Sequence, residues 1–218
     1  MAFSKIELVN LYNKRAQYYD FTANLYYLIG YREYYYRKKT IEALNLKEGD
    51  TVLEIACGTG LNFSLLHDAV GPSGKIIGLD VTDKMLEQAQ KRIESKNWKN
   101  VELINADATQ FKFPKGLNGV FSTFAITLIP EYEQVIKKGS ESLVSGGRFA
   151  ILDFKKPENR PMWIIKLLAR AMRPFGVTLD LADRHPWEAI EKYFQINYFQ
   201  EFYFGFSYLS VGEARKGS

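Results

Sequence analysis

Thr51-Val-Leu-Glu-Ile-Ala-Cys-Gly-Thr-Gly60 is the stretch that decides the fold of this chain. Its apolar run, Val52 to Ile55, is too short for a helix, and we predict a buried parallel strand. Gly58 and Gly60 then predict a tight turn. Such a turn lets a ligand approach backbone N–H groups, and a helix beginning near Leu61 would point its positive end at the same place. The stretch therefore predicts a nucleotide-type pocket at the carboxyl end of a strand.

A second apolar run, Lys75-Ile-Ile-Gly-Leu79, ends in Asp80. In nucleotide-binding α/β folds, an acidic residue at the end of the second strand binds the two hydroxyls of a ribose. Asp80 could also be the N-cap of the helix expected from Asp83, and the two roles are compatible. Because most glycine pairs after strands are plain turns, Asp80 is the residue that favours a ligand pocket here.

A set of segments in this order resembles the motifs of class I S-adenosylmethionine-dependent methyltransferases: Glu54-Ile-Ala-Cys-Gly-Thr-Gly60, Gly78-Leu-Asp80, Ala106-Asp-Ala108 and Leu143-Val-Ser-Gly-Gly-Arg-Phe-Ala-Ile-Leu-Asp-Phe154. The resemblance covers about residues 44 to 155. Within that superfamily the chain most resembles the branch of ubiquinone/menaquinone C-methyltransferases and bacterial phospholipid N-methyltransferases. It departs from the pattern in three places. Ala56 replaces the first glycine of the Gly-x-Gly-x-Gly motif, and Ser145 replaces a common proline. Asn118-Gly119 replaces the usual acidic residue before the fourth strand. We expect alanine to be small enough to keep cofactor binding.

The resemblance implies an α/β fold: a doubly wound, Rossmann-like seven-stranded sheet with an antiparallel last hairpin and an N-terminal helical lid. Residues 1–218 would be a single methyltransferase domain, with the lid at 1–45, the cofactor-binding core at 46–155, and acceptor-side helices and the closing hairpin at 156–218. The hydrophobic pattern agrees with this order. It predicts strands at 51–56, 75–80, 101–104, 119–124, 148–154, 196–204 and 206–213, and helices at 4–18, 22–45, 61–69, 83–96, 132–143 and 186–194, with Gly205 as the last turn.

By the same resemblance the expected cofactor is S-adenosylmethionine. The cofactor-binding residues that it implies are Tyr19, Glu54, Ala56, Gly58, Gly60, Asn62, Asp80, Val81, Met85, Asp107, Ala108 and Phe124. In such enzymes Asp107 would accept from the adenine amine and Ala108 would supply backbone, although Asp107 could be a plain loop residue. Tyr12-Asn-Lys-Arg-Ala-Gln-Tyr-Tyr-Asp20 resembles the lid element, but Tyr19 could equally be a core aromatic. Ala125-Ile-Thr-Leu-Ile-Pro130 would line the passage from cofactor to acceptor.

The catalytic residues are harder to assign, because an activated methyl group leaves the protein mainly to place the acceptor and exclude water. An amine acceptor is mostly protonated near neutral pH, and a quinol acceptor would have to lose a phenolic proton. Candidates for moving that proton are Tyr19, Asp153 and His185. Asp153 ends the fifth strand and could instead cap a turn.

Composition excludes several classes of protein. Cys57 is the single cysteine, so an intramolecular disulfide is excluded and a cytoplasmic location is the simplest expectation. We interpret Cys57 as a packing residue. His67 and His185 are far apart with no cysteine partners, so we predict no metal site. The net charge of +4 is mild and no nucleic-acid-binding signature is present, so we expect no nucleic-acid partner. We also find no secretory signal and no span-length apolar stretch.

Two segments combine apolar or aromatic residues with cations: Tyr26 to Lys39, and Arg160 to Pro174. This composition suits peripheral contact with an anionic membrane, at its inner face. Each segment could instead pack on the core or cover the acceptor pocket. We therefore expect the methyl acceptor to be a membrane lipid with an amine headgroup, of the phosphatidylethanolamine type.

Other functions stay open from the sequence. The acceptor could be a quinone precursor, methylated at carbon, or a soluble small molecule. A module that binds the cofactor without turnover is the non-enzymatic alternative. A nicotinamide dehydrogenase is a further alternative, but the order of the motifs favours a methyltransferase over it.

Overall fold

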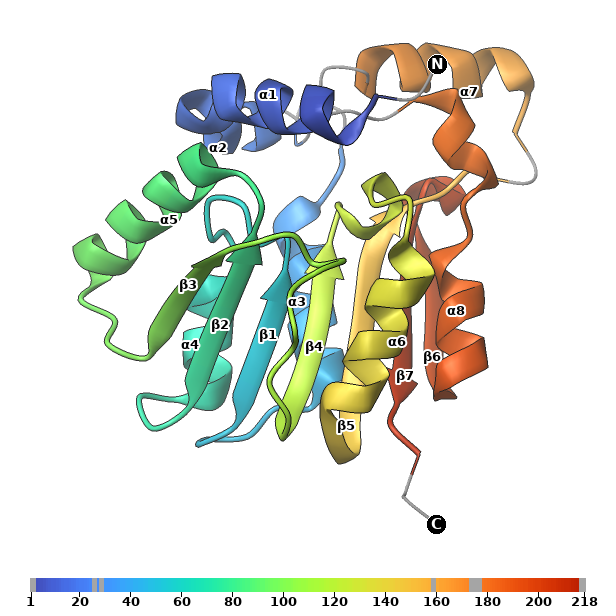
Figure 1. Ribbon diagram of the computed structural model, residues 1–218. Helices are drawn as coiled ribbons and strands as arrows, with labels where there is room; N and C mark the ends of the chain where they lie inside the picture. The colour runs from blue at the N-terminus through green and yellow to red at the C-terminus, as the bar shows by residue number, and fades with distance from the viewer. Residues whose placement is uncertain (1–2, 25–26, 28–29, 158–159, 173–177, 216–218) are drawn as a thin grey trace.

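The computed structural model describes residues 3–24, 27, 30–157, 160–172 and 178–215. Its centre is a seven-stranded sheet in the order β3-β2-β1-β4-β5-β7-β6. The strands β1 to β5 are parallel, and β7 is antiparallel to both β5 and β6 (Figure 1). The strands are β1 (Thr51–Ile55), β2 (Lys75–Asp80), β3 (Val101–Asn105), β4 (Leu117–Thr123), β5 (Leu143–Phe154), β6 (Gln195–Phe202) and β7 (Ser207–Glu213). The predicted doubly wound sheet with an antiparallel last hairpin is confirmed.

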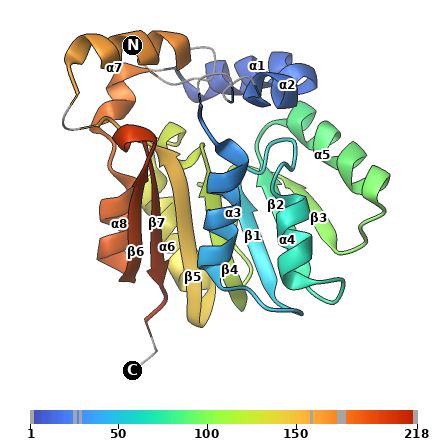
Figure 2. The same cartoon turned by 180° about the vertical axis from the view of Figure 1, so that it is seen from behind.

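Helices cover both faces of this sheet (Figures 1 and 2). One face carries α3 (Glu33–Leu44), α4 (Phe63–Val70) and α5 (Asp83–Lys96), and the other carries α6 (Tyr132–Ser142) and α8 (Pro186–Tyr193). The central strands read as continuous apolar runs because both of their faces are buried. No helix or strand forms over residues 106–116, where the buried Phe113 packs on the sheet instead.

A third group of helices lies beyond the carboxyl ends of the parallel strands, as both views show (Figures 1 and 2). It consists of α1 (Lys5–Arg15), α2 (Tyr19–Asn24) and α7 (Met162–Met172). A capping box between Ser4 and Glu7 begins α1. Among the described residues, no helix has the length and apolar character that a bilayer span requires.

The N-terminal helices bend where the sequence predicted one continuous helix. The prediction of a helix over 22–45 is wrong, because α2 ends at Asn24 and α3 begins at Glu33. Gly30 has a φ of 78°, a left-handed conformation that interrupts a helix and that glycine adopts readily. The chain turns there and buries Tyr31 among the rings of Tyr36, Phe124 and Phe154. Part of the aromatic segment Tyr26 to Lys39 lies outside the described residues.

The strand β5 also begins earlier than predicted, at Leu143 rather than Arg148. Leu143 already pairs with Leu117 of β4. On its other side, the Gly147 carbonyl accepts from the backbone N–H of Ala214 at 2.8 Å. The local sequence around the glycines does not predict this strand pairing, because the pairing partners lie far away in the chain.

Candidate functional site

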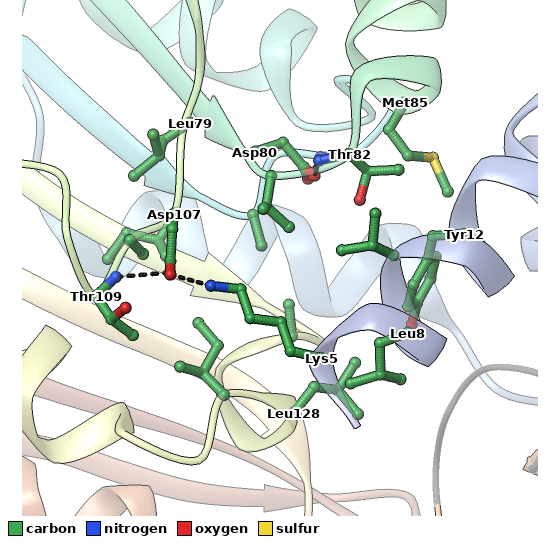
Figure 3. Close-up of a pocket in the computed structure, with 18 of the residues that line it drawn as sticks. Lys5, Leu8, Tyr12, Leu79, Asp80, Thr82, Met85, Asp107, Thr109 and Leu128 are labelled. Carbon is green, nitrogen blue, oxygen red and sulfur yellow. Dashed lines mark hydrogen bonds and ion pairs between the residues drawn. The ribbon is translucent and has the colours of Figure 1, made fainter. Parts of the chain in front are cut away.

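A cleft opens at the carboxyl ends of β1, β2, β3 and β4 (Figure 3). It encloses about 960 Å³ of empty space, part of which is open to solvent. The N-terminal helices form its roof with Lys5, Leu8, Val9, Tyr12 and Tyr19. The strand ends and their loops supply Ile55, Ala56, Gly58, Leu79, Asp80, Val81, Thr82, Met85, Ala106, Asp107, Ala108, Thr109, Thr123, Phe124, Ala125, Leu128, Ile129, Pro130 and Glu131.

The turn after β1 exposes backbone to this cleft. Ala56 and Gly58 both have a φ of 55°, so the alanine that replaces the motif's first glycine holds a left-handed conformation. Cys57 is buried beside them, and burial raises the pKa of its thiol well above the ordinary value. The thiol therefore stays protonated, which agrees with a packing role for Cys57.

Asp80 joins the end of β2 to this turn. Its Oδ2 accepts from the backbone N–H of Gly58 at 2.8 Å, and its Oδ1 from that of Thr82 at 2.8 Å. Burial raises the pKa of Asp80, while these N–H groups oppose the rise. Each carboxylate oxygen can accept more than one hydrogen bond, so capacity remains for a ligand. The alternative role as helix N-cap is wrong, because Thr82 holds that position in α5.

Asp107 follows β3 and meets the roof of the cleft (Figure 3). Its Oδ1 accepts from the Thr109 backbone N–H at 2.9 Å, and its Oδ2 is paired with the Lys5 ammonium of α1. Burial alone would raise the pKa of Asp107, but the hydrogen bonds from Lys5 and Thr109 lower it below the ordinary value. Sequence reasoning missed Lys5, since no motif surrounds it and its partner is 102 positions away.

Tyr19 lies in the roof at the first position of α2. Its ring centre is 6.1 Å from that of Tyr12, which also lines the cleft. Burial raises the pKa of Tyr19 to about 12, so its hydroxyl keeps its proton at neutral pH. In that state Tyr19 is a hydrogen-bond donor and not a base.

The roof is tied to the rest of the site by polar contacts. The Asp20 carboxylate accepts from the Thr59 hydroxyl at 2.5 Å and is paired with Arg92 of α5. Arg92 also donates to the Thr59 carbonyl at 2.9 Å. In addition, the Asn13 side chain accepts from the backbone N–H of Lys84 in the first turn of α5 at 3.2 Å. These contacts fix α1 and α2 to the glycine turn and to α5.

Two predicted cofactor residues belong to a buried network beneath the cleft rather than to its lining. The Glu54 Oε1 accepts from the Asn62 amide at 2.6 Å, and that amide also donates to the Thr123 hydroxyl at 2.9 Å. Arg37 donates to Thr123 at 2.6 Å and to Glu33 at 2.6 and 2.8 Å. Burial raises the pKa of Glu54 to about 8, so it holds a proton near neutral pH. The network positions Thr123, which does line the cleft.

Gly60 also lies outside the lining of the cleft. A side chain at this position would lie against the ring of Phe63, which is fully buried. Gly60 is thus required for packing the turn against α4. The remaining predicted cofactor residues line the cleft, namely Tyr19, Ala56, Gly58, Asp80, Val81, Met85, Asp107, Ala108 and Phe124.

The structure does not bring Asp153 and His185 to the cleft that Tyr19 lines. Asp153 is buried, and its Oδ2 accepts from both the backbone N–H and the hydroxyl of Thr127 at 2.9 Å. Burial raises the pKa of Asp153 to about 6. His185 precedes α8, with its Nδ1 3.1 Å from the Glu188 carboxylate. Asp153 therefore fastens the turn after β4 to β5, as the capping alternative expected.

The far wall of the cleft is apolar. It consists of Phe124, Ala125, Leu128, Ile129 and Pro130, which follow β4. Four residues of the segment 125–130, which was predicted to line the passage between cofactor and acceptor, belong to this wall, whereas Ile126 and Thr127 are buried behind it. Phe124 is itself held in place by the Arg37 guanidinium, 5.0 Å from the centre of its ring.

A family model described as the ubiE/COQ5 methyltransferase family matches residues 3–176, the greater part of the chain. The chain belongs to this family. Membership confirms the resemblance to class I methyltransferases.

Two curated relatives from different bacterial genera have the same name. The chain is 31% identical to the demethylmenaquinone methyltransferase of Listeria welshimeri over 129 residues, 59% of this chain and 54% of that protein. It is 35% identical to the protein of the same name from Lactobacillus johnsonii over 160 residues, 72% of this chain and 64% of that protein. The match thus spans between about half and two thirds of the length of these curated relatives. The names are those of the quinone branch, not of the phospholipid branch.

Solved structures share the fold. A methyltransferase from Aquifex aeolicus superposes with a TM-score of 0.59 at 19% identity, covering 82% of this chain and 89% of that one. The geranyl diphosphate C-methyltransferase of Streptomyces coelicolor gives a TM-score of 0.66 at 12% identity, covering 84% and 79%. At these identities the likeness shows the fold alone.

Proposed function

We propose that this protein is an S-adenosylmethionine-dependent methyltransferase that transfers a methyl group to a carbon atom of a quinone precursor. The observation that carries the proposal is the placement of Asp80 and Asp107. Asp80 ends β2 and Asp107 follows the end of the neighbouring strand β3, and both line the cleft beside the glycine turn. Membership of the ubiE/COQ5 methyltransferase family supports the reaction class.

The cleft has groups that suit the parts of this cofactor. The Asp80 carboxylate would accept from the two ribose hydroxyls, and Asp107 from the adenine amine. The amine would then share Asp107 with the Lys5 ammonium of the roof. The backbone between Ala56 and Gly58 would lie along the cofactor's amino-acid part. Beneath the cleft and outside its lining, the Oε2 of Glu54 is buried without a hydrogen-bond partner among the described residues.

The chain's residues would place the acceptor and keep out water. When bound, S-adenosylmethionine supplies an activated methyl group. Leu128, Ile129 and Pro130 offer an apolar wall for a quinol ring, and Tyr12 and Tyr19 close the cleft above it. A protonated Tyr19 would donate a hydrogen bond to a quinol oxygen. We therefore assign Tyr19 to positioning the acceptor.

A quinone precursor replaces the amine lipid that the sequence favoured. The names of the relatives support a quinone acceptor and give no support to a phospholipid amine. The apolar wall of the cleft also suits a neutral aromatic ring better than a charged headgroup.

The proposal is tested by incubating the protein with methyl-labelled S-adenosylmethionine and either demethylmenaquinol or phosphatidylethanolamine, each dispersed in the same detergent. We expect label in the quinol and none in the amine lipid. Asp80→Asn should weaken binding of S-adenosylhomocysteine, because one backbone N–H of Gly58 or Thr82 would face an amide N–H. The matched control is Asp83→Asn, an exposed aspartate in the first turn of α5. Label in the amine lipid, or equal binding by the two variants, would contradict the proposal.

A further inference from the structure

The outward face of α7 carries large apolar side chains in water. Trp163 is 68% exposed, Leu167 61% and Met162 48%. Because helix residues three or four apart share a face, the cations of α7 point the same way as these side chains. The exposed residues of this face are Met162, Trp163, Lys166, Leu167 and Arg170, which we call the α7 face. On the opposite side Ile165 is buried and attaches the helix to the body of the protein.

Another exposed apolar side chain lies near the start of α7. Phe204, at the turn between β6 and β7, is 72% exposed and has a φ of 59°. A bulky residue is unfavourable in this left-handed conformation. The Arg160 guanidinium lies 5.4 Å from the centre of the Phe204 ring. An exposed aromatic with a cation beside it thus repeats the composition of the α7 face.

The charged side chains of α7 are all cationic. The sequence of α7 contains Lys166 and Arg170 but no aspartate or glutamate. Lysine and arginine can lay their apolar stems along a lipid surface while their charged ends reach the phosphate groups, and tryptophan favours the boundary between lipid and water. An acidic protein partner would match the cations but not the protruding tryptophan and leucine. The composition matches an anionic lipid surface in both respects.

We propose that the α7 face and Phe204 dock the protein on an anionic membrane surface. The α7 helix and the roof of the cleft lie beyond the same end of the sheet (Figures 1 and 2). Docking therefore holds the cleft near the bilayer, where an apolar acceptor dissolves. The biological sense of this surface rests on the proposed function, but the docking itself needs neither cofactor nor acceptor.

Vesicle flotation without any methyl donor tests the inference. The purified protein is mixed with vesicles of phosphatidylcholine alone, or of phosphatidylcholine and phosphatidylglycerol. We expect binding to the anionic vesicles only, weakening as salt is added. In Lys166→Gln/Arg170→Gln binding should fall about 25-fold, since each cation near an anionic surface contributes about 1 kcal/mol and about 1.4 kcal/mol is a tenfold change. Trp163→Ala should weaken it at least tenfold, by roughly the free energy of burying a large apolar side chain.

The charge-matched control is Lys47→Gln/Lys99→Gln. Both lysines are exposed and precede the amino ends of β1 and β3, at the other end of the sheet. This control should bind within about twofold of the unmodified protein, because its cations would lie beyond a Debye length from the surface. Equal losses in both double variants would show unspecific attraction and overturn the inference. Absence of binding to anionic vesicles would overturn it too, as would a dimer in sedimentation that Trp163→Ala dissociates. Binding of S-adenosylhomocysteine by the same variants, measured separately, reports on the proposed function alone.

Discussion

Replacing Gly60 with alanine should destabilise the protein far more than the same change at Gly58, two positions earlier in the same turn. Both glycines are left-handed, with φ of 77° and 55°. A Cβ at Gly60 would lie 2.5 Å from Cδ2 and 2.6 Å from Cε2 of the Phe63 ring. A Cβ at Gly58 would meet no described atom within 4 Å. The fully buried Phe63 has little freedom to move, because its ring also lies against Gly78.

The two variants therefore share one penalty and differ in the other. The left-handed conformation costs alanine about 1–2 kcal/mol at either position. Crowding of a packed core adds about 1–3 kcal/mol at Gly60 only. We expect the free energy of unfolding to fall by about 1–2 kcal/mol in Gly58→Ala and by about 2–5 kcal/mol in Gly60→Ala. For a chain of this size the larger change lowers Tm by roughly 4–20 °C.

Urea unfolding followed by circular dichroism measures both free energies, and calorimetry with S-adenosylhomocysteine measures ligand binding. Because Gly58 lines the cleft and Gly60 does not, Gly58→Ala should keep its fold and lose affinity. Two variants of equal stability would refute the assignment of Gly60 to packing. So would a Gly60→Ala protein that is as stable as the unmodified one.

Other residues of the site give predictions of the same kind. Ala56→Gly should raise the free energy of unfolding in urea by up to about 1 kcal/mol, because the left-handed strain of alanine is relieved while the unfolded chain gains entropy. Asp153 has a pKa raised from 3.8 to about 6, so the folded state binds its proton more tightly than the unfolded state. Ionisation of Asp153 therefore lowers the free energy of unfolding by roughly 3 kcal/mol as the pH rises from about 4 to 6. Asp153→Asn should flatten this part of the pH profile of urea unfolding. Lys5→Met should raise the pKa of Asp107 in a carbon NMR titration of the carboxyl groups, because the Lys5 hydrogen bond lowers it. The free energy of unfolding should change by less than about 1 kcal/mol, because Lys5 is half exposed.

The central elements could be predicted from the sequence because their signals are local. The helix α5 has the predicted bounds Asp83–Lys96, and its predicted inner face, Met85, Leu86, Ala89 and Ile93, is buried. Strand β2 likewise has its predicted bounds. A hydrophobic period of a few residues is sufficient for both, since each element buries one continuous stripe or run.

Elements that depend on distant partners could not be predicted in this way. Nothing in the local pattern shows that Tyr31 lies outside a helix and packs against Tyr36, Phe124 and Phe154. The early start of β5 depends on Leu117 and Ala214, which lie far from it in the chain. Glycine favours a break in one place and is tolerated within a strand in another, and only the tertiary partners decide between the two.

Some residues of the candidate site could be predicted from local patterns, and others depend on distant partners. Gly58, Asp80 and Asp107 could be predicted to lie together, because the carboxyl ends of neighbouring parallel strands meet at one edge of a sheet. Glu54 and Asn62 were expected beside the cofactor from family motifs, yet they form the polar network under Thr123. A motif indicates that a residue matters at a site without indicating whether it contacts the ligand.

The sequence suggests the cofactor more readily than the acceptor, because the motifs form only one part of the cleft. The motifs supply the floor of the cleft, from the turn after β1 to the end of β3. The roof comes from α1 and α2, fixed by the contacts of Asp20 with Thr59 and Arg92, and the far wall comes from the segment after β4. An acceptor would lie between roof and wall, which are lined by side chains such as Leu8 and Leu128 from distant parts of the chain. Specificity for the acceptor would then depend on tertiary contacts that no short motif encodes, and we expect an exchange of α1 and α2 between relatives to change the preferred acceptor in the labelling assay.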